Sequence, residues 1–185
     1  MKPFSALAVT ALIALLPVAA QAQDWTGPYV GVTLGHGTGD VTNPLTSTFD
    51  LGGEAYGLYA GYLYQNGSLV YGGELAYQSA AVDLDALPGQ GFDQLVDLKG
   101  RLGYAAGPVL FYGVLGYSSN RYAIPEGTSR GDGPAFGLGL DYQLSERVML
   151  GAEYMSRSMK NGLSGGVNPV ESDISTLSVR MALRF

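Results

Sequence analysis

Charged side chains stand at alternating positions inside apolar segments of this 185-residue sequence. Asp97, Lys99 and Arg101 are two residues apart, so in a β-strand all three point to one side. Side chains of both signs on one side can form ion pairs, or they can line a channel that selects ions. Mixed signs, three bases against four acids, favour pairing. The predicted charge network contains Glu74, Asp97, Lys99, Arg101, Asp141, Glu153 and Arg180.

The residue types give little support for catalysis or metal binding. The sequence has one histidine, His36, which is followed by Gly37, and it has no cysteine. His36 shares the parity of Val30 and Val32, which indicates an imidazole at the rim of a strand. A metal site needs several clustered ligands, which one histidine and scattered carboxylates do not supply. We therefore expect no catalytic residue, no metal site and no cofactor.

Eight alternating segments hold these charges. Each has about the 9–11 residues that a tilted strand needs to cross a bilayer. They are separated in turn by short connections and long polar stretches, which is typical of a transmembrane antiparallel β-barrel with an even strand number. The expected strands are residues 29–37, 53–65, 69–79, 94–105, 109–118, 134–144, 148–157 and 174–185.

The connections predict which end of the barrel faces outward. Asn66 and Gly67 form a tight-hairpin signal, and residues 106–108 and 145–147 are the other short turns. In outer-membrane barrels short turns lie in the periplasm and long loops lie outside. The expected extracellular loops are residues 38–52, 80–93, 119–133 and 158–173.

Strand parity predicts which side chains point inward. Every charge of the predicted network, and Arg184 as well, lies on the side of its strand opposite an apolar row. This is expected if the apolar row faces lipid, because a lipid-facing charge near mid-membrane costs about 2–4 kcal/mol. Glu54 shares the apolar side, at a loop end near water. Segment 109–118 is ambiguous, since Phe111 and Tyr112 point to opposite sides. An eight-stranded barrel is just wide enough for side chains to fill, so paired charges would plug it.

The aromatic residues fall into two bands, as expected for rings at the two membrane interfaces. Alternating aromatics also occur in the cores of soluble sandwiches, but the banding and the loop pattern together favour a membrane barrel. The band near the short turns contains Tyr62, Tyr64, Tyr71, Tyr104, Phe111, Tyr142 and Phe185. The band near the long loops contains Tyr56, Tyr77, Tyr117, Phe136 and Tyr154.

Both ends of the sequence point to export and membrane insertion. Residues 1–22 combine a basic Lys2, an apolar run over residues 6–16 and an Ala20-Gln21-Ala22 site, which predicts a cleaved signal peptide. We expect one barrel domain over residues 23–185. Phe185 ends an alternating segment, as expected for a ring at the membrane edge. With 10 basic and 16 acidic residues, the chain offers no basic cluster for nucleic acid.

The stretch from Asp24 to Gly31, Asp-Trp-Thr-Gly-Pro-Tyr-Val-Gly, resembles the start of the small outer-membrane β-barrel superfamily, which includes OmpA-like barrels and opacity-type surface proteins. Residues 57–62, 71–74 and 184–185 resemble further family positions. The resemblance implies a bacterial outer-membrane location and contact with lipid and lipopolysaccharide. It also implies that Phe185 is the signal read by the barrel-assembly machinery.

Three function classes follow from this reading. The first is a structural or surface-interaction protein with a plugged interior and an unidentified loop partner. The alternative is a narrow pore or a porin-like transport protein. A lipid A-modifying enzyme is least supported, because the His-x-Ser arrangement of such barrels is missing after His36. The acidic loops could meet cations bound to lipopolysaccharide phosphates, although a solvated acidic surface explains them as well.

Overall fold

The computed structural model describes residues 24–43, 47–81, 83–84, 87–124, 127–161 and 170–185, so the expected signal segment lies outside the described residues. In these ranges no helix is long and apolar enough to cross a membrane. The strands are β1 (Gly27–Asn43), β2 (Ser47–Asn66), β3 (Leu69–Ala81), β4 (Asp83–Leu84), β5 (Leu87–Ala106), β6 (Val109–Ile124), β7 (Gly127–Gln143), β8 (Val148–Asn161) and β9 (Val170–Arg184).

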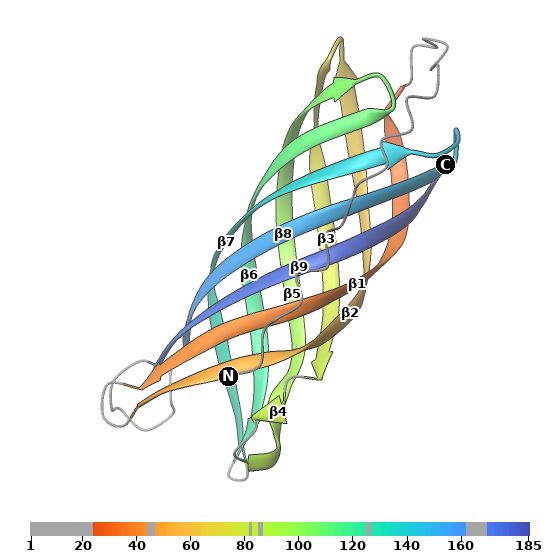
Figure 1. Ribbon diagram of the computed structural model, residues 1–185. Helices are drawn as coiled ribbons and strands as arrows, with labels where there is room; N and C mark the ends of the chain where they lie inside the picture. The colour runs from red at the N-terminus through yellow and green to blue at the C-terminus, as the bar shows by residue number, and fades with distance from the viewer. Residues whose placement is uncertain (1–23, 44–46, 82, 85–86, 125–126, 162–169) are drawn as a thin grey trace, which may run out of the picture.

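The eight long strands close into an antiparallel barrel (Figure 1). Neighbours in sequence pair with each other, β1 pairs with β9, and β3 pairs with β5 to complete the ring. The two-residue β4 pairs only with β5. Closure leaves no long strand with an unpaired edge, and it confirms the predicted eight-stranded barrel.

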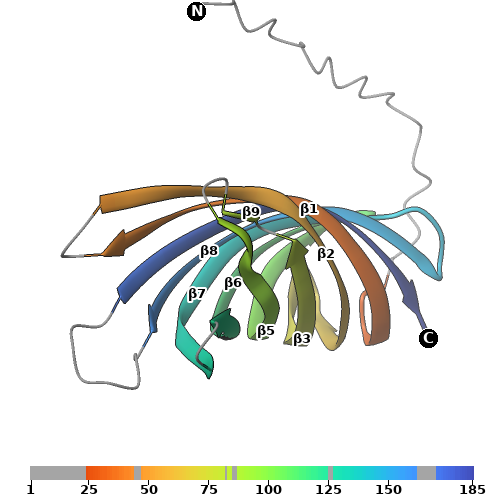
Figure 2. The same cartoon turned by 90° about the horizontal axis from the view of Figure 1, so that it is seen from below.

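The three short turns lie at one end of the barrel with the C-terminus, and the last pairs of the β1–β2 and β8–β9 ladders lie at the other (Figures 1 and 2). Gly67 and Gly107 have φ of 63° and 61°, a left-handed conformation that glycine adopts without a Cβ clash. At the third turn, the N–H of Leu144 donates to the carbonyl of Val148 at 2.9 Å. The sequence therefore predicts all three short turns at their positions.

In the expected long loops, most of the residues that the structure describes continue the strands, so the strands are longer than the expected ranges. The β1–β2 ladder continues to the pair Asn43 and Ser47, and the β6–β7 ladder continues to Ile124 and Gly127. These polar, glycine-rich stretches lack the apolar row that marks a lipid-facing strand. The alternation of apolar and polar residues therefore stops where the strands leave the membrane. Backbone pairing needs no such row, and the ladders run on as hairpins.

Side-chain exposure alternates along the strands. In β5, Asp97 is 0% exposed and the next residue, Leu98, is 65% exposed. In β6, Tyr112 is 4% exposed whereas Leu115 is 75% exposed, which settles the facing of this segment. The outer surface is therefore an apolar band, and the polar side chains point into the barrel.

Candidate functional site in the barrel interior

Six charged residues form one cluster inside the barrel, and alternation along five strands places them there. Each is at most 4% exposed. Within this interior cluster the charges balance, three acids against three bases. The members are Glu74 of β3, Lys99 and Arg101 of β5, Asp141 of β7, Glu153 of β8 and Arg180 of β9.

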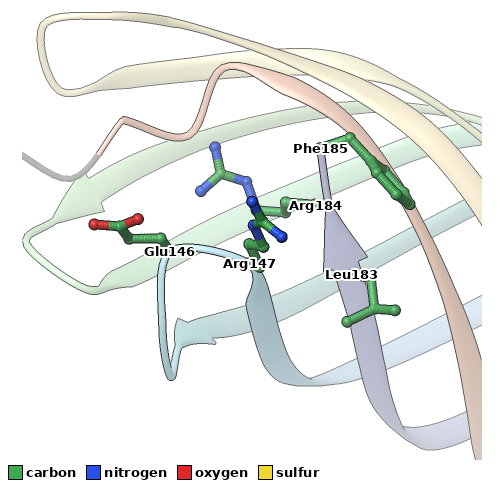
Figure 3. Close-up of a pocket in the computed structure, with 5 residues that line it drawn as sticks. All are labelled: Glu146, Arg147, Leu183, Arg184 and Phe185. Carbon is green, nitrogen blue, oxygen red and sulfur yellow. The ribbon is translucent and has the colours of Figure 1, made fainter.

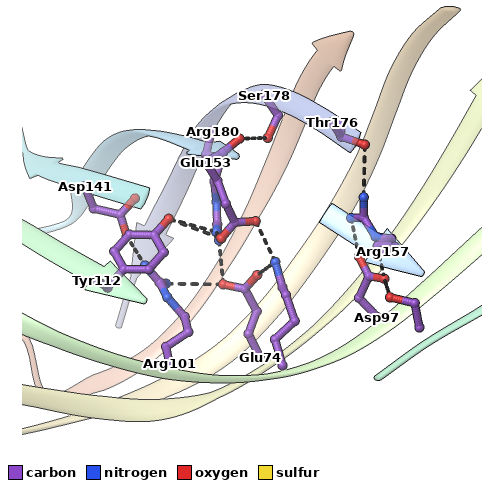
Figure 4. A network of polar contacts seen from close by, with 12 residues as sticks. Glu74, Asp97, Arg101, Tyr112, Asp141, Glu153, Arg157, Thr176, Ser178 and Arg180 are labelled. Atoms are coloured by element: carbon purple, nitrogen blue, oxygen red, sulfur yellow. Dashed lines mark hydrogen bonds and ion pairs between the residues drawn. The ribbon is translucent and has the colours of Figure 1, made fainter. Parts of the chain in front are cut away.

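Glu74 is the centre of the interior cluster (Figure 4). Its Oε1 lies 2.5 Å from Lys99 Nζ, and its Oε2 lies 2.5 Å from Arg180 Nη2. Lys99 Nζ also lies 2.8 Å from Glu153 Oε1, and Glu153 contacts Arg180 as well. Because β2 and β1 separate β3 from β9 in the sheet, the contact between Glu74 and Arg180 crosses the interior.

Arg101 links the cluster to a second wall of the barrel. Its Nη1 lies 3.2 Å from Glu74 Oε2, and its Nη2 contacts the carboxylate of Asp141. Its guanidinium carbon lies 3.7 Å from the centroid of the Tyr112 ring. This geometry adds a cation–π contact to two ion pairs.

Tyrosine hydroxyls donate to the acids of the cluster. Tyr29 Oη donates to Glu74 Oε2 at 2.9 Å, and Tyr112 Oη donates to Glu153 Oε2 at 3.2 Å. The Tyr59 ring lies below Arg180, whose guanidinium carbon is 4.0 Å from the ring centroid. The buried charges are therefore both paired and hydrogen-bonded, which is what makes burial tolerable.

Glycines on neighbouring strands make room for these rings. A Cβ at Gly31 would lie 2.4 Å from the ring of Tyr59, and one at Gly139 would lie 2.3 Å from the ring of Tyr112. Real Cβ contacts are not that short, so any side chain there would displace the tyrosine. The abundant inward glycines thus determine where the aromatic rings lie.

Asp97 belongs to a separate ion pair with Arg157. Its Oδ2 lies 2.7 Å from Arg157 Nη2, and its Oδ1 accepts from Arg157 Nε at 3.1 Å and from Ser118 Oγ at 2.5 Å. Arg157 also donates to Thr176 Oγ1 at 3.0 Å. Arg157 is not among the predicted network residues. Its parity with Glu153, four residues earlier, is the signal that would have found it.

An apolar layer fills the interior near the short turns. Trp25 is fully buried, its backbone N–H donates to Gln65 Oε1 at 2.7 Å, and it packs in one cluster with Leu63, Val70 and Leu110. Trp25 lies two residues before β1, so its side chain packs into the mouth of the barrel from outside the first strand. The tryptophan of the resemblance motif is therefore a packing residue here.

The other singled-out residues lie on the outside. His36 and Glu54 are exposed on adjacent strands and face each other in the β1–β2 register. Phe185 is 78% exposed, and its N–H donates to the carbonyl of Pro28 at 3.1 Å. Among the described side chains, no group of three or more His, Cys, Asp or Glu residues could hold a metal ion.

Comparison with known proteins identifies the family. The sequence matches the outer membrane protein beta-barrel domain over residues 8–185. The chain belongs to this family. As a member of the outer membrane protein β-barrel family, it is a bacterial outer-membrane protein, and the apolar band of its surface faces lipid. No curated protein matches the sequence significantly.

Solved structures share the fold at low sequence identity. Neisserial surface protein A (NspA) has a TM-score of 0.56 and 21% identity, with 86% of this chain and 98% of that chain covered. Ail, the attachment invasion locus protein of Yersinia pestis, has a TM-score of 0.50 and 16% identity, with 86% and 99% covered. At these identities the similarity shows the barrel architecture alone.

Proposed function

We propose that this outer-membrane β-barrel is a structural and surface-interaction protein whose interior is closed by the six-residue cluster. The observation that carries the proposal is the contact between Glu74 and Arg180 across the interior. Lys99 and Arg101 complete the charge around Glu74. A selective pore keeps part of its charge free for passing ions, whereas these charges are compensated by one another.

The length of the strands supports a role at the cell surface. β2 and β5 have 20 residues each, and β1 and β7 have 17, about twice the 9–11 needed to cross a bilayer. Paired hairpins extend beyond the membrane and are stiffer than open loops. They would present a defined surface to an extracellular partner.

Recording ion currents tests the closed interior. The full barrel, refolded in detergent and inserted into planar bilayers, should show no steady conductance. The double variant Glu74→Ala/Arg180→Ala removes both side chains of the cross-interior pair and should show openings that the wild type lacks. A large, stable and ion-selective conductance of the wild type would replace this proposal with the porin function.

One observation favours a narrow pore as the second candidate. Among the described residues, Arg101 Nε and Arg180 Nε are buried without a hydrogen-bond partner. Leaving such a donor unpaired costs about 1–3 kcal/mol, and internal water would satisfy it. A hydrated interior would pass small ions at low rates, and the same recordings would detect a small steady current in the wild type.

A further inference from the structure

A pocket of about 540 Å³ lies outside the interior cluster, at the short-turn end of the barrel (Figure 3). It lies between the β7–β8 turn and the end of β9. The residues that line it differ in chemistry, with two cations, one anion and two apolar side chains. They are Glu146, Arg147, Leu183, Arg184 and Phe185.

The two arginines place positive charge at one edge of the pocket. The backbone N–H of Arg184 donates to the carbonyl of Arg147 at 2.8 Å, so their main chains adjoin. Arg147 is exposed, whereas Arg184 is only 8% exposed and its Nη2 donates to the carbonyl of Thr26 at 3.1 Å. Among the described residues neither forms an ion pair. The exposed Arg147 therefore retains donors for an anion, whereas Arg184, on the inward side of β9 and close enough to Asp24 to interact with it, adds positive charge beside the pocket.

The apolar residues of the pocket locate it relative to the bilayer. Leu183 and Phe185 are exposed and continue the outward row of β9, which faces acyl chains. That row ends where the charged turn begins, so the pocket lies at the depth of lipid headgroups. Arginine and aromatic side chains are typical of this interface.

We propose that the pocket binds a phospholipid with an amine-bearing headgroup from the adjoining leaflet. Arg147 binds the phosphate, since guanidinium donors match phosphate oxygens in geometry and charge, and the nearby Arg184 adds to the positive charge there. Glu146 pairs with the headgroup amine, and Leu183 and Phe185 contact the acyl chains. The carboxylate in the same pocket is what favours a zwitterionic lipid over an anionic one.

Native mass spectrometry of the detergent-solubilised barrel tests this site. Samples are mixed with phosphatidylethanolamine, with phosphatidylglycerol, or with inorganic phosphate. We expect one phosphatidylethanolamine to stay bound. Arg147→Gln should weaken it about tenfold, the effect of losing one charge-assisted hydrogen bond. Glu146→Gln should remove the preference for phosphatidylethanolamine over phosphatidylglycerol.

A matched control separates the site from general charge effects. Arg130→Gln makes the same charge change in β7, at the opposite end of the barrel, where Arg130 pairs in register with Arg121. It should leave lipid binding unchanged. Equal losses in the two variants would overturn the proposal, and so would inorganic phosphate that competes fully with the lipid. Arg147 is in an exposed turn, so its variant should fold, which a heat-modifiability gel verifies.

Discussion

Glu74 and Arg180 are 106 positions apart in the chain, and Arg180 Nη2 lies 2.5 Å from Glu74 Oε2 in the barrel interior. Two strands separate β3 from β9 in the sheet, so the contact connects non-adjacent strands across the interior. Through Lys99 and Arg101, Glu74 also contacts β5. The carboxylate of Glu74 thus contacts three bases, two on the adjacent strand β5 and one on the non-adjacent strand β9, and these contacts join the interior cluster into one ion-pair network.

Glu153→Ala and Arg180→Ala should each lower the melting temperature of the refolded barrel. Each removes one partner of a buried pair and leaves a charge uncompensated, a loss of roughly 3–5 kcal/mol. The double variant should recover part of the loss, because Glu74 keeps Lys99 and Arg101. Thermal unfolding in one detergent compares the four proteins. Losses that simply add would contradict the coupling.

Asp97→Ala should destabilise the barrel to a similar extent through a different pair. It leaves Arg157, which is 0% exposed, without its carboxylate partner. Asp173→Ala is the matched control, since Asp173 is exposed and, among the described side chains, accepts a hydrogen bond from Ser158 alone, and surface changes of this kind usually stay within about 0.5 kcal/mol. Urea titration of both variants measures the difference. A similar midpoint for both would show that the buried pair contributes little.

The sequence predicts the inward side chains because a charged side chain that faces lipid near mid-membrane is costly. Lys99 and Arg101 could be placed inside for this reason. Contacts between neighbouring strands, such as Glu153 with Arg180, also follow from strand order. The contact of Glu74 with Arg180 does not, because the tilt and stagger of the closed barrel decide which side chains meet across the interior.

Two features were beyond the sequence for physical reasons. Arg157 shares the inward parity of Glu153, but parity alone does not show that its partner is Asp97 on β5. The long hairpins beyond the membrane carry no apolar row, so their pairing has no pattern in the sequence. These hairpins form because the backbone ladder continues wherever neighbouring strands stay aligned.

Single cysteines should establish which end of the barrel faces outward. The chain has no cysteine, so labelling has no background. Cysteines at Thr48 and Ser129, in the long hairpins, should react with an impermeant maleimide on intact cells. Those at Ser68 and Ala106, beside the short turns, should react only after the outer membrane is opened. Labelling at Ser68 on sealed cells would reverse the topology.

Adjacent glycines in β3 should respond in opposite ways to alanine. A Cβ at Gly72 would lie 2.0 Å from the carbonyl oxygen of Tyr62 and 3.0 Å from Leu63 Cα, whereas a Cβ at Gly73 would meet only Lys99 O at 3.9 Å. Gly72→Ala must therefore move β2 away from β3, and overpacking of this kind costs about 1–3 kcal/mol. Gly73→Ala points outward and should be neutral or stabilising by up to about 1 kcal/mol, since alanine loses less backbone entropy than glycine.

The two alanine variants have the same composition and differ only in the face that receives the methyl group, so each is the control for the other. The folded fraction after refolding into lipid vesicles, followed by gel mobility without heating, gives the comparison. Gly72→Ala should fold in lower yield and unfold at lower urea concentration. If Gly73→Ala were the more damaging of the two, the facing of β3 would be wrong, and with it the inward placement of Glu74.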